Sequence, residues 1–288
     1  MNALLADLLR LLELERIEIN LFRGASRDIG SAQVFGGQVL GQALVAASAT
    51  VDGRDAHSLH AYFLRRGDFK APIVYEVDRS RDGGSFSSRR VVAVQHGHQI
   101  FHMSASFQKP ETGLDHQLSA PVVPMPESLP DHMTALRKRL DSLPPERRRV
   151  WESERPWEFR LVEPVADQPQ PADSVRHVWF RVTQRCPDDP ILHRCLLAYL
   201  SDFQLLETAL LPHGVSHFDG RLTIASIDHA MWFHRPVRID DWLLYVLSSP
   251  SASGSRGFAT GRIYDRGGAL VASVAQEGLM RWRPPSAT

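Results

Sequence analysis

Apolar residues recur along the chain with two periods, and the order of those periods is the same in its two halves. Spacings of three and four predict helices over 32–48 and 191–210. Alternation of apolar and polar residues predicts antiparallel strands, one before each helix and the others after it. The expected strands cover 17–22, 57–64, 73–79, 87–95 and 99–108 in the first half, and 175–182, 222–233, 242–248, 257–264 and 269–279 in the second. This order indicates an α+β fold.

Short similarities between the halves favour an internal duplication, with chance resemblance of two β-rich segments as the alternative. His60-Ala61-Tyr62-Phe63 resembles His229-Ala230-Met231-Trp232. Between the halves, eleven of the 19 prolines fall from Pro110 to Pro171, which predicts a connector with one helix near 131–142. We therefore divide the chain into an N-terminal unit (1–110), a connector (111–174) and a C-terminal unit (175–288).

The composition narrows the function classes. Lys plus Arg and Asp plus Glu number 33 each, so net charge gives no reason to expect nucleic acid or an anionic membrane as a partner. No run of about 18 apolar residues occurs, so no membrane span is expected. The leucines near the N-terminus follow helical spacing between charges, which favours an amphipathic helix over a secretory signal. With Cys186 and Cys195 as the two cysteines, we expect a cytoplasmic protein without a disulfide framework.

Three polar residues of the second half fall on faces that are otherwise apolar. Asp202 lies in a helical stripe that contains Cys195 and Ala209. Ser226 and Gln276 each share a strand face with the apolar residues two and four positions before them. Each residue alone also fits a structural role: a cap at a helix break, a serine bonded to backbone, or a structural amide. Together, a carboxylate, a hydroxyl and an amide could hold one water molecule, with the carboxylate accepting its proton.

Longer motifs, spread over nearly the whole chain, are similar to those of a known enzyme family. They are Leu21-Phe22-Arg23-Gly24, Gln33-Val34-Phe35-Gly36-Gly37-Gln38-Val39, His60 with Tyr62-Phe63-Leu64-Arg65, Ser85-Phe86 with Arg89-Arg90, Ser201-Asp202, Ile227-Asp228-His229 with Met231-Trp232-Phe233-His234-Arg235-Pro236, and Gln276-Glu277-Gly278. On these residues the chain resembles the acyl-CoA thioesterase II family. The resemblance implies a double-hotdog fold, hydrolysis of fatty acyl-CoA to free fatty acid and CoA, and no cofactor.

The resemblance also implies a catalytic set. In that family an Asp on the second-half helix, a Thr or Ser before the Ile-Asp-His motif, and the Gln of Gln-Glu-Gly act together. These positions match Asp202, Ser226 and Gln276 here, with serine standing where the family usually has threonine. Our hypothesis is direct attack by water on the thioester, with Asp202 as general base and Ser226 and Gln276 orienting the water.

Glycines and arginines are candidates for the remaining contacts with the substrate. The N–H groups of Gly36 and Gly37, at the start of the first helix, are candidate donors to the carbonyl oxygen. CoA is polyanionic, and arginine pairs well with phosphate, although solvated surface arginines are the alternative. The arginines considered are Arg65, Arg66, Arg89 and Arg90.

Other reaction classes lack their motifs. The chain has no Gly-x-Ser-x-Gly elbow, P-loop or Gly-x-Gly-x-x-Gly, and its 13 histidines form no metal-binding motif, so no metal is expected. Two alternatives stay open: a hotdog enoyl-CoA hydratase or dehydratase that uses Asp228 and His229, and a non-catalytic acyl-CoA-binding module. Because a curved sheet leaves edges to cover, a homo-oligomer is expected.

Overall fold

The computed structural model describes residues 2–29, 33–141, 145, 148, 152–163, 166, 168–216 and 219–283. The first half contains α1 (Ala3–Leu12), β1 (Glu15–Glu18), β2 (Leu21–Gly24), α2 (Gly36–Ser48), β3 (Asp55–Phe63), β4 (Ile73–Asp82), β5 (Phe86–Gln95) and β6 (His98–Gln108). The middle segment contains η1 (Pro126–Ser128), α3 (His132–Asp141) and β7 (Trp157–Leu161). The second half contains β8 (Val175–Val182), α5 (Pro190–Ser201), η2 (Leu206–His213), β9 (Leu222–Ser226), β10 (Asp228–Phe233), β11 (Leu243–Ser253), β12 (Arg256–Asp265) and β13 (Leu270–Trp282).

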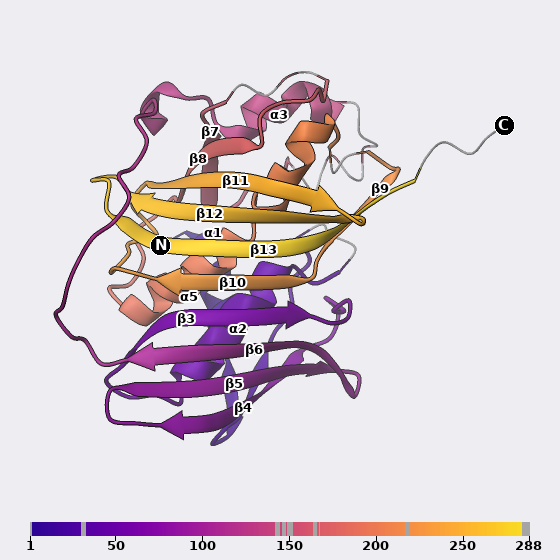
Figure 1. The fold of residues 1–288 in the computed structure, drawn as a ribbon. Helices are drawn as coiled ribbons and strands as arrows, with labels where there is room; N and C mark the ends of the chain where they lie inside the picture. The colour runs from indigo at the N-terminus through magenta and orange to yellow at the C-terminus, as the bar shows by residue number, and fades with distance from the viewer. Residues whose placement is uncertain are drawn as a thin grey trace.

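These strands form one continuous antiparallel sheet (Figure 1). Neighbours follow the order β1-β2-β4-β5-β6-β3-β10-β13-β12-β11-β8-β7, and β9 pairs with β13 outside that path. The order β2-β4-β5-β6-β3 of the first half corresponds to β8-β11-β12-β13-β10 of the second. The halves join where β3 and β10 lie side by side, with His60 opposite Ala230. One sheet therefore runs through both halves, with equivalent strands at its centre.

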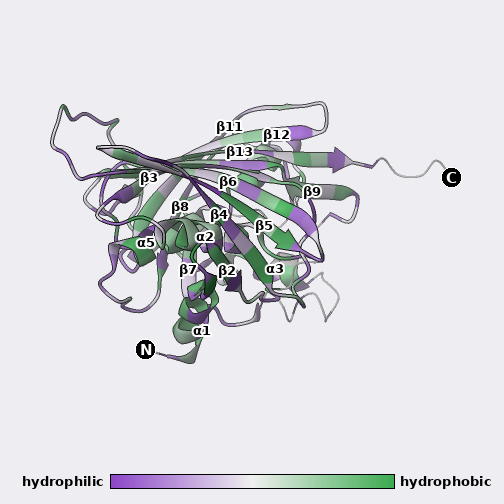
Figure 2. Cartoon of the chain, turned by 90° about the horizontal axis from the view of Figure 1, so that it is seen from below, coloured by the Kyte–Doolittle hydropathy of each residue, from purple (hydrophilic) through white to green (hydrophobic). Residues whose placement is uncertain are grey.

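The two long helices lie together beneath the curved sheet (Figure 2). Their inward residues, such as Leu40 and Leu44 of α2 and Leu196 of α5, are fully buried. Glycine lets α2 approach α5 closely, because a Cβ atom on Gly37 would lie 2.2 Å from the backbone oxygen of Tyr199. This contact places the first turn of α2 against the last turn of α5, which is where the candidate site is found.

The second helix and the strand after it differ from the sequence prediction. The helix expected over 191–210 ends at Ser201, because Gln204 adopts a left-handed backbone conformation with φ 67° and η2 then follows. The strand expected over 222–233 divides at Ile227. β9 pairs with the C-terminal end of β13, whereas β10 lies between an earlier part of β13 and β3. Both breaks lie next to the polar residues singled out in the sequence.

The proline-rich segment contains more structure than a connector requires. Its helix α3 agrees with the helix expected near 131–142. The sequence did not predict β7, which adds an edge strand to β8. Residues before it pack on the outer face of the sheet, where the Trp179 indole N–H donates to the Pro124 carbonyl at 2.9 Å. The boundaries of the three predicted units stay a prediction.

Replacing Gly37 with alanine should lower the free energy of unfolding by about 1–3 kcal/mol, because the added methyl group overlaps the backbone of α5. Urea unfolding measures the change. Gly84→Ala is the control, since nothing lies within 4 Å of a methyl group at that position, and it should change stability by less than about 0.5 kcal/mol. Equal effects of the two substitutions would contradict the close helix packing.

Candidate active site

Asp202 stands at the C-terminal end of α5. The helix begins with an Asp189 cap, whose side chain accepts from the N–H of Ile191, followed by Pro190 in the first turn. The helix ends when the chain turns away after Ser201, leaving Asp202 as the C-cap residue. The side chain of Asp202 is 5% exposed. The helix break therefore places a carboxylate inside the protein, at the junction of the two halves.

The three polar residues expected from the sequence lie within hydrogen-bond distance of one another. The side-chain N–H of Gln276 donates to Asp202 Oδ1 at 2.7 Å and to Ser226 Oγ at 3.0 Å. The sheet register explains this proximity, because Ser226 on β9 pairs with Gly278 of β13, two residues from Gln276 and on the same face. The cluster thus takes one side chain from α5, one from β9 and one from β13.

A backbone donor from the first half completes the surroundings of the carboxylate. The N–H of Gly37 donates to Asp202 Oδ2 at 2.8 Å. The start of a helix favours a negative charge, so α2 stabilises the ionised form of Asp202. A Cβ atom on Gly36 would lie 2.8 Å from the same oxygen. A side chain at position 36 would therefore collide with the carboxylate, which explains why glycine stands there as well. Because the N–H of Gly37 is already engaged, only Gly36 of the expected glycine pair remains a candidate donor to a substrate oxygen.

Burial makes Asp202 a stronger base than an exposed aspartate. Desolvation raises the pKa of its carboxyl group above the usual range, and hydrogen bonds from Gln276, Gly37 and Ser226 offset part of that rise. Gln276 is fully buried, and its side-chain oxygen has no hydrogen-bond partner among the residues that the structure describes. The cluster thus combines a carboxylate of raised proton affinity with fixed polar groups.

His229 is a neighbour of the cluster that the sequence interpretation did not place there. The side chain is fully buried, and its Nδ1 atom lies 3.8 Å from Asp202 Oδ1. The sequence singled it out only as a partner of Asp228. However, Asp228 points to the other face of β10, where it accepts from the N–H of Glu277 at 2.7 Å. Strict alternation along β10 was the signal that would have directed His229 towards α5.

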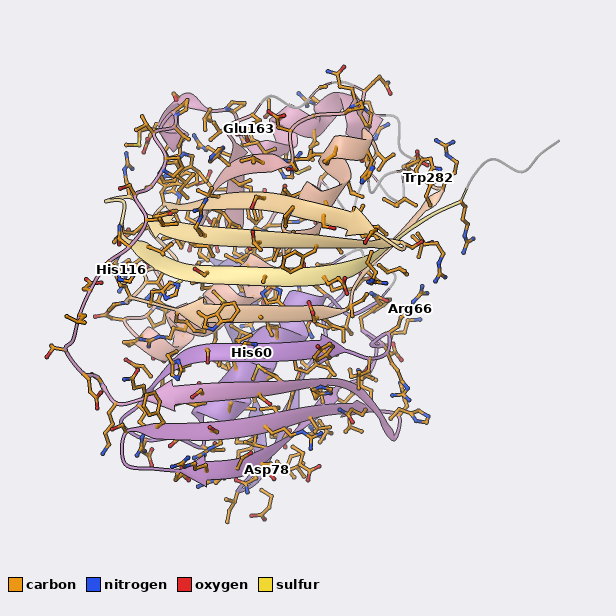
Figure 3. All side chains as sticks on the ribbon, in the orientation of Figure 1. His60, Arg66, Asp78, His116, Glu163 and Trp282 are labelled. Carbon is orange, nitrogen blue, oxygen red and sulfur yellow. The ribbon has the colours of Figure 1, made fainter. Side chains whose placement is uncertain are left out.

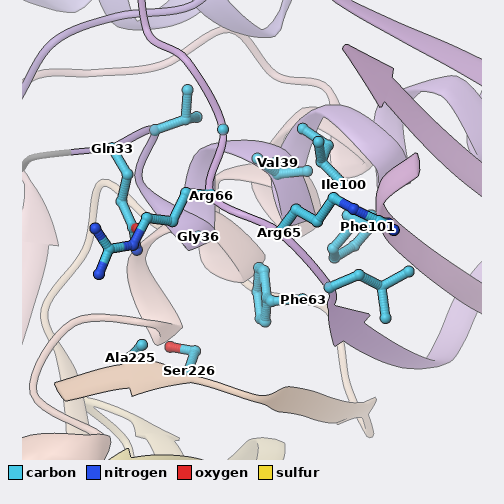
Figure 4. Close-up of a pocket in the computed structure, with 13 residues that line it drawn as sticks. Gln33, Gly36, Val39, Phe63, Arg65, Arg66, Ile100, Phe101, Ala225 and Ser226 are labelled. Carbon is cyan, nitrogen blue, oxygen red and sulfur yellow. The ribbon is translucent and has the colours of Figure 1, made fainter. Parts of the chain in front are cut away.

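A cavity of about 190 Å³ opens beside Ser226. Its apolar wall includes Val39, Phe63 and Phe101, and Gly36 also lines it. Figure 4 shows Ala225 and Ser226 on one side of the cavity, with Arg65 and Arg66 across from them. The cavity therefore joins an apolar wall, two cations and the serine of the cluster.

The two candidate arginines at the cavity lie on the turn after β3. Arg65 is oriented by donation to the Gln99 carbonyl at 2.7 Å. Figure 3 places Arg66 at the margin of the molecule, away from the outer sheet face that carries His60. Both arginines are exposed, so an anionic group can reach them from the solvent.

The other two candidate arginines do not line this cavity. Arg89 is 2% exposed, and its guanidinium is bound by Thr50 and by Asp82 at 2.7 Å. Its neighbour Arg90 points to the opposite face of β5, where it pairs with Ser104 on the outer side of the sheet. Neither lines the cavity, because consecutive strand residues alternate and Arg89 already has its partners.

Within the described ranges, no group of three or more His, Cys, Asp or Glu residues is arranged to hold a metal ion. Among the helices of the same ranges, none is long and apolar enough to cross a membrane.

Sequence profiles of known families match both halves of the chain. A profile described as acyl-CoA thioesterase matches residues 153–279, and one described as acyl-CoA thioesterase N-terminal domain matches residues 25–108. The chain is 42% identical over 286 residues to acyl-CoA thioesterase 2 of Haemophilus influenzae, covering 98% of this chain and 99% of that protein.

Solved structures of thioesterases and of a hot dog fold protein are also similar to this chain. Acyl-CoA thioesterase II TesB2 of Mycobacterium marinum is 45% identical with a TM-score of 0.78, covering 96% of this chain and 99% of that one. A hot dog fold protein of Alicyclobacillus acidocaldarius, 19% identical with a TM-score of 0.77 over 96% of this chain and 98% of that one, bears on the fold alone. The fold is a double hotdog, and the chain belongs to the acyl-CoA thioesterase II family of thioester hydrolases.

Proposed function

We propose that this enzyme hydrolyses fatty acyl-CoA to free fatty acid and CoA by direct attack of a water molecule. Asp202 is the general base, and Ser226 and Gln276 orient the water. The observation that carries the proposal is the buried carboxylate of Asp202, which shares the Gln276 amide with Ser226 next to the cavity. A base of raised pKa and two fixed polar groups suit proton removal from water near neutral pH.

The proposed reaction needs no covalent enzyme intermediate, because a thiolate is a good leaving group. Asp202 takes a proton from the water as the water oxygen bonds to the thioester carbon. One water O–H bond breaks and an O–H bond to Asp202 forms. Collapse of the tetrahedral intermediate breaks the C–S bond, and the proton passes from Asp202 to the CoA sulfur. The N–H of Gly36, in the cavity wall, is the candidate donor to the carbonyl oxygen as its charge develops.

The cavity has the two kinds of surface that an acyl-CoA presents. Arg65 and Arg66 provide cations for the CoA phosphates, and Phe63 and Phe101 provide an apolar surface next to the thioester. We place the thioester carbon beside Ser226, where the cavity meets the polar cluster. This orientation brings the carbonyl within reach of a water held by Asp202.

Hydration of an enoyl-CoA is the second candidate, and the geometry disfavours it. That reaction would need an aspartate and a histidine that both reach the substrate. Asp228 and His229 point to opposite faces of β10, and His229 is fully buried outside the cavity wall. Hydrolysis requires neither residue to touch the substrate, so it fits the described site better.

A cytoplasmic location and a homo-oligomeric assembly remain proposals that rest on the sequence. The same holds for the division into an N-terminal unit over 1–110, a connector over 111–174 and a C-terminal unit over 175–288. The sheet register across β3 and β10 is compatible with a boundary between two structural units that share one sheet.

Asp202→Asn should lower kcat roughly 10²–10⁴-fold, because the amide cannot accept the proton. Thiol release from acyl-CoA of two to eighteen carbons, followed with a chromogenic disulfide, measures the rate. Ser226→Thr is the matched conservative variant, since it keeps the hydroxyl, and it should stay within a few-fold of wild type. An Asp202→Asn enzyme that folds and retains its rate would disprove the general-base role.

The same substitution should raise thermal stability at pH 8. Burial raises the pKa of Asp202 in the folded state, so the stabilising protonated form is lost as pH rises through that pKa. Asparagine removes the buried charge, so the gain in melting temperature should be larger at pH 8 than at pH 4. Calorimetry at the two pH values checks this; a gain that shrinks as pH rises would mean the carboxylate is not destabilised by burial.

Replacing Arg65 and Arg66 together with glutamine should raise KM for acyl-CoA roughly tenfold or more, because two cations that face the phosphates are lost. The kcat value should change little. S-acyl-pantetheine lacks the phosphates, so its KM should not change. Arg90→Gln, on the outer sheet face, serves as the control. Equal losses with both substrates would place the phosphates elsewhere.

A further inference from the structure

One buried nitrogen next to the active site has no partner in the described structure. His229 is fully buried, and its Nδ1 atom forms no hydrogen bond. The nearest acidic oxygen is Asp202 Oδ1 at 3.8 Å, which is too far for a hydrogen bond. An unsatisfied buried polar atom is costly and calls for an explanation.

The surrounding hydrogen bonds fix which ring nitrogen carries the proton. The Ser201 hydroxyl donates to the Ala198 carbonyl at 2.9 Å, so its oxygen is left to accept. The other ring nitrogen, Nε2 of His229, lies 3.1 Å from that oxygen and must therefore donate to it. Burial also lowers the pKa of His229 to about 3, which keeps the ring neutral. His229 Nδ1 is thus a bare acceptor that faces the carboxylate.

We propose that His229 is a positioning residue whose Nδ1 atom accepts a hydrogen bond from Asp202 after Asp202 has taken the proton from water. No covalent proton transfer to the ring is involved. The water O–H bond breaks, the new O–H bond lies on Asp202 Oδ1, and closing the gap by roughly 1 Å gives a normal hydrogen bond to the ring. The inference rests on the proposed general-base role of Asp202.

This arrangement favours the protonated form of Asp202 over the ionised form. While Asp202 is a carboxylate, its Oδ1 atom and His229 Nδ1 are both hydrogen-bond acceptors. Once Asp202 is protonated, its O–H group is a donor and His229 Nδ1 can accept from it. The interaction is therefore gained as the proton is transferred, which is when it accelerates the reaction. His229 raises the basicity of Asp202 without touching the substrate.

The other groups around Asp202 do not compete for this role. From β9 and β13 come Ser226 and Gln276, and from α2 the N–H of Gly37. The phenols of Tyr199 on α5 and Tyr245 on β11 are buried, and burial raises the pKa of both.

Two cations lie beyond this shell. The positive charges of Arg27 and Arg155 lower the pKa of the Tyr199 hydroxyl and so offset part of the rise that burial causes. Asp228 and Glu277 lie on the outer face of the sheet, bound to backbone and to Arg256 respectively. Asp202 is therefore the acidic group whose protonation gives His229 Nδ1 a hydrogen-bond donor.

The test is the pH profile of His229→Gln. Glutamine can keep a donor near Ser201 but has no acceptor at the Nδ1 position. We expect kcat at pH 8 to fall roughly three- to tenfold and the acidic limb of the kcat profile to move to lower pH by about half a unit to one unit. A structural defect would lower the rate without moving the limb. An unchanged limb, or one moved to higher pH, would overturn the proposal.

Two further variants sharpen the result. Ser201→Ala removes the acceptor for Nε2, which frees the ring to protonate Nδ1 and donate to the carboxylate, so it should also move the acidic limb to lower pH. His60→Gln, on the exposed outer face of β3, is the matched control and should leave the profile unchanged.

Nitrogen NMR of the wild-type imidazole tests the tautomer without any variant or activity. The Nε2–H form from pH 5 to pH 9 is expected, and an Nδ1–H form or a charged ring would refute the assignment. If Asp202→Asn kept its activity, the proposed function itself would fail. If that variant were inactive and His229→Gln left the limb in place, only the role of His229 would fail.

Discussion

The hydrogen bond from the Gly37 N–H to the Asp202 carboxylate joins the start of one helix to the end of the other, and the rest of the site depends on it. It requires the first turn of α2 to lie against the last turn of α5, which only glycine permits at that point of contact. It also provides a positive helix terminus for a charge that is otherwise taken out of water. The same hydrogen bond therefore depends on the close packing of α2 against α5 and stabilises the charge of the buried base.

In the described part of the double hotdog, the two halves contribute differently to this arrangement. The helix of the first half ends at Ser48 and is followed by Ala49, whereas that of the second half ends at Ser201 and is followed by Asp202. The first half instead supplies the glycine turn, the apolar cavity wall and the arginines. The N-terminal half therefore acts as the complement of the C-terminal half, and neither half alone contains the whole site.

The sequence predicted the features that follow from local periodicity, namely the positions of strands and the faces on which side chains lie. Alternation correctly directed Gln276 inward, and most strands fall close to their expected positions. The exceptions are the strand expected over 17–22, which spans the end of β1, a turn and the start of β2, and the one over 222–233, which divides into β9 and β10. Asp202 was also directed inward, although the helix that carried the argument ends one residue before it. The resemblance to a family, rather than periodicity, assigned these residues a shared role. Their proximity depends on the pairing of β9 with β13, which no local pattern contains.

Two of the errors come from contacts between different segments, and the third from alternation that was not followed along one strand. Arg89 looked like a phosphate ligand, but Thr50 and Asp82 enclose its guanidinium. The edge strand β7 lies among prolines, and its pairing with β8 outweighs the local signal. His229 was paired with its sequence neighbour, although the strand directs the two side chains to opposite faces. Contacts with other segments decide the first two cases, whereas alternation within β10 decides the third.

The central claim is that Asp202 activates water instead of attacking the thioester itself, and one turnover in isotopic water tests it. Enzyme in excess over acyl-CoA is mixed in water enriched in oxygen-18, and the first fatty acid released is analysed by mass spectrometry. Direct attack by water predicts one heavy oxygen in that fatty acid and none in Asp202. Unlabelled fatty acid from the first turnover, with the heavy oxygen in the Asp202 carboxyl group, would contradict the account.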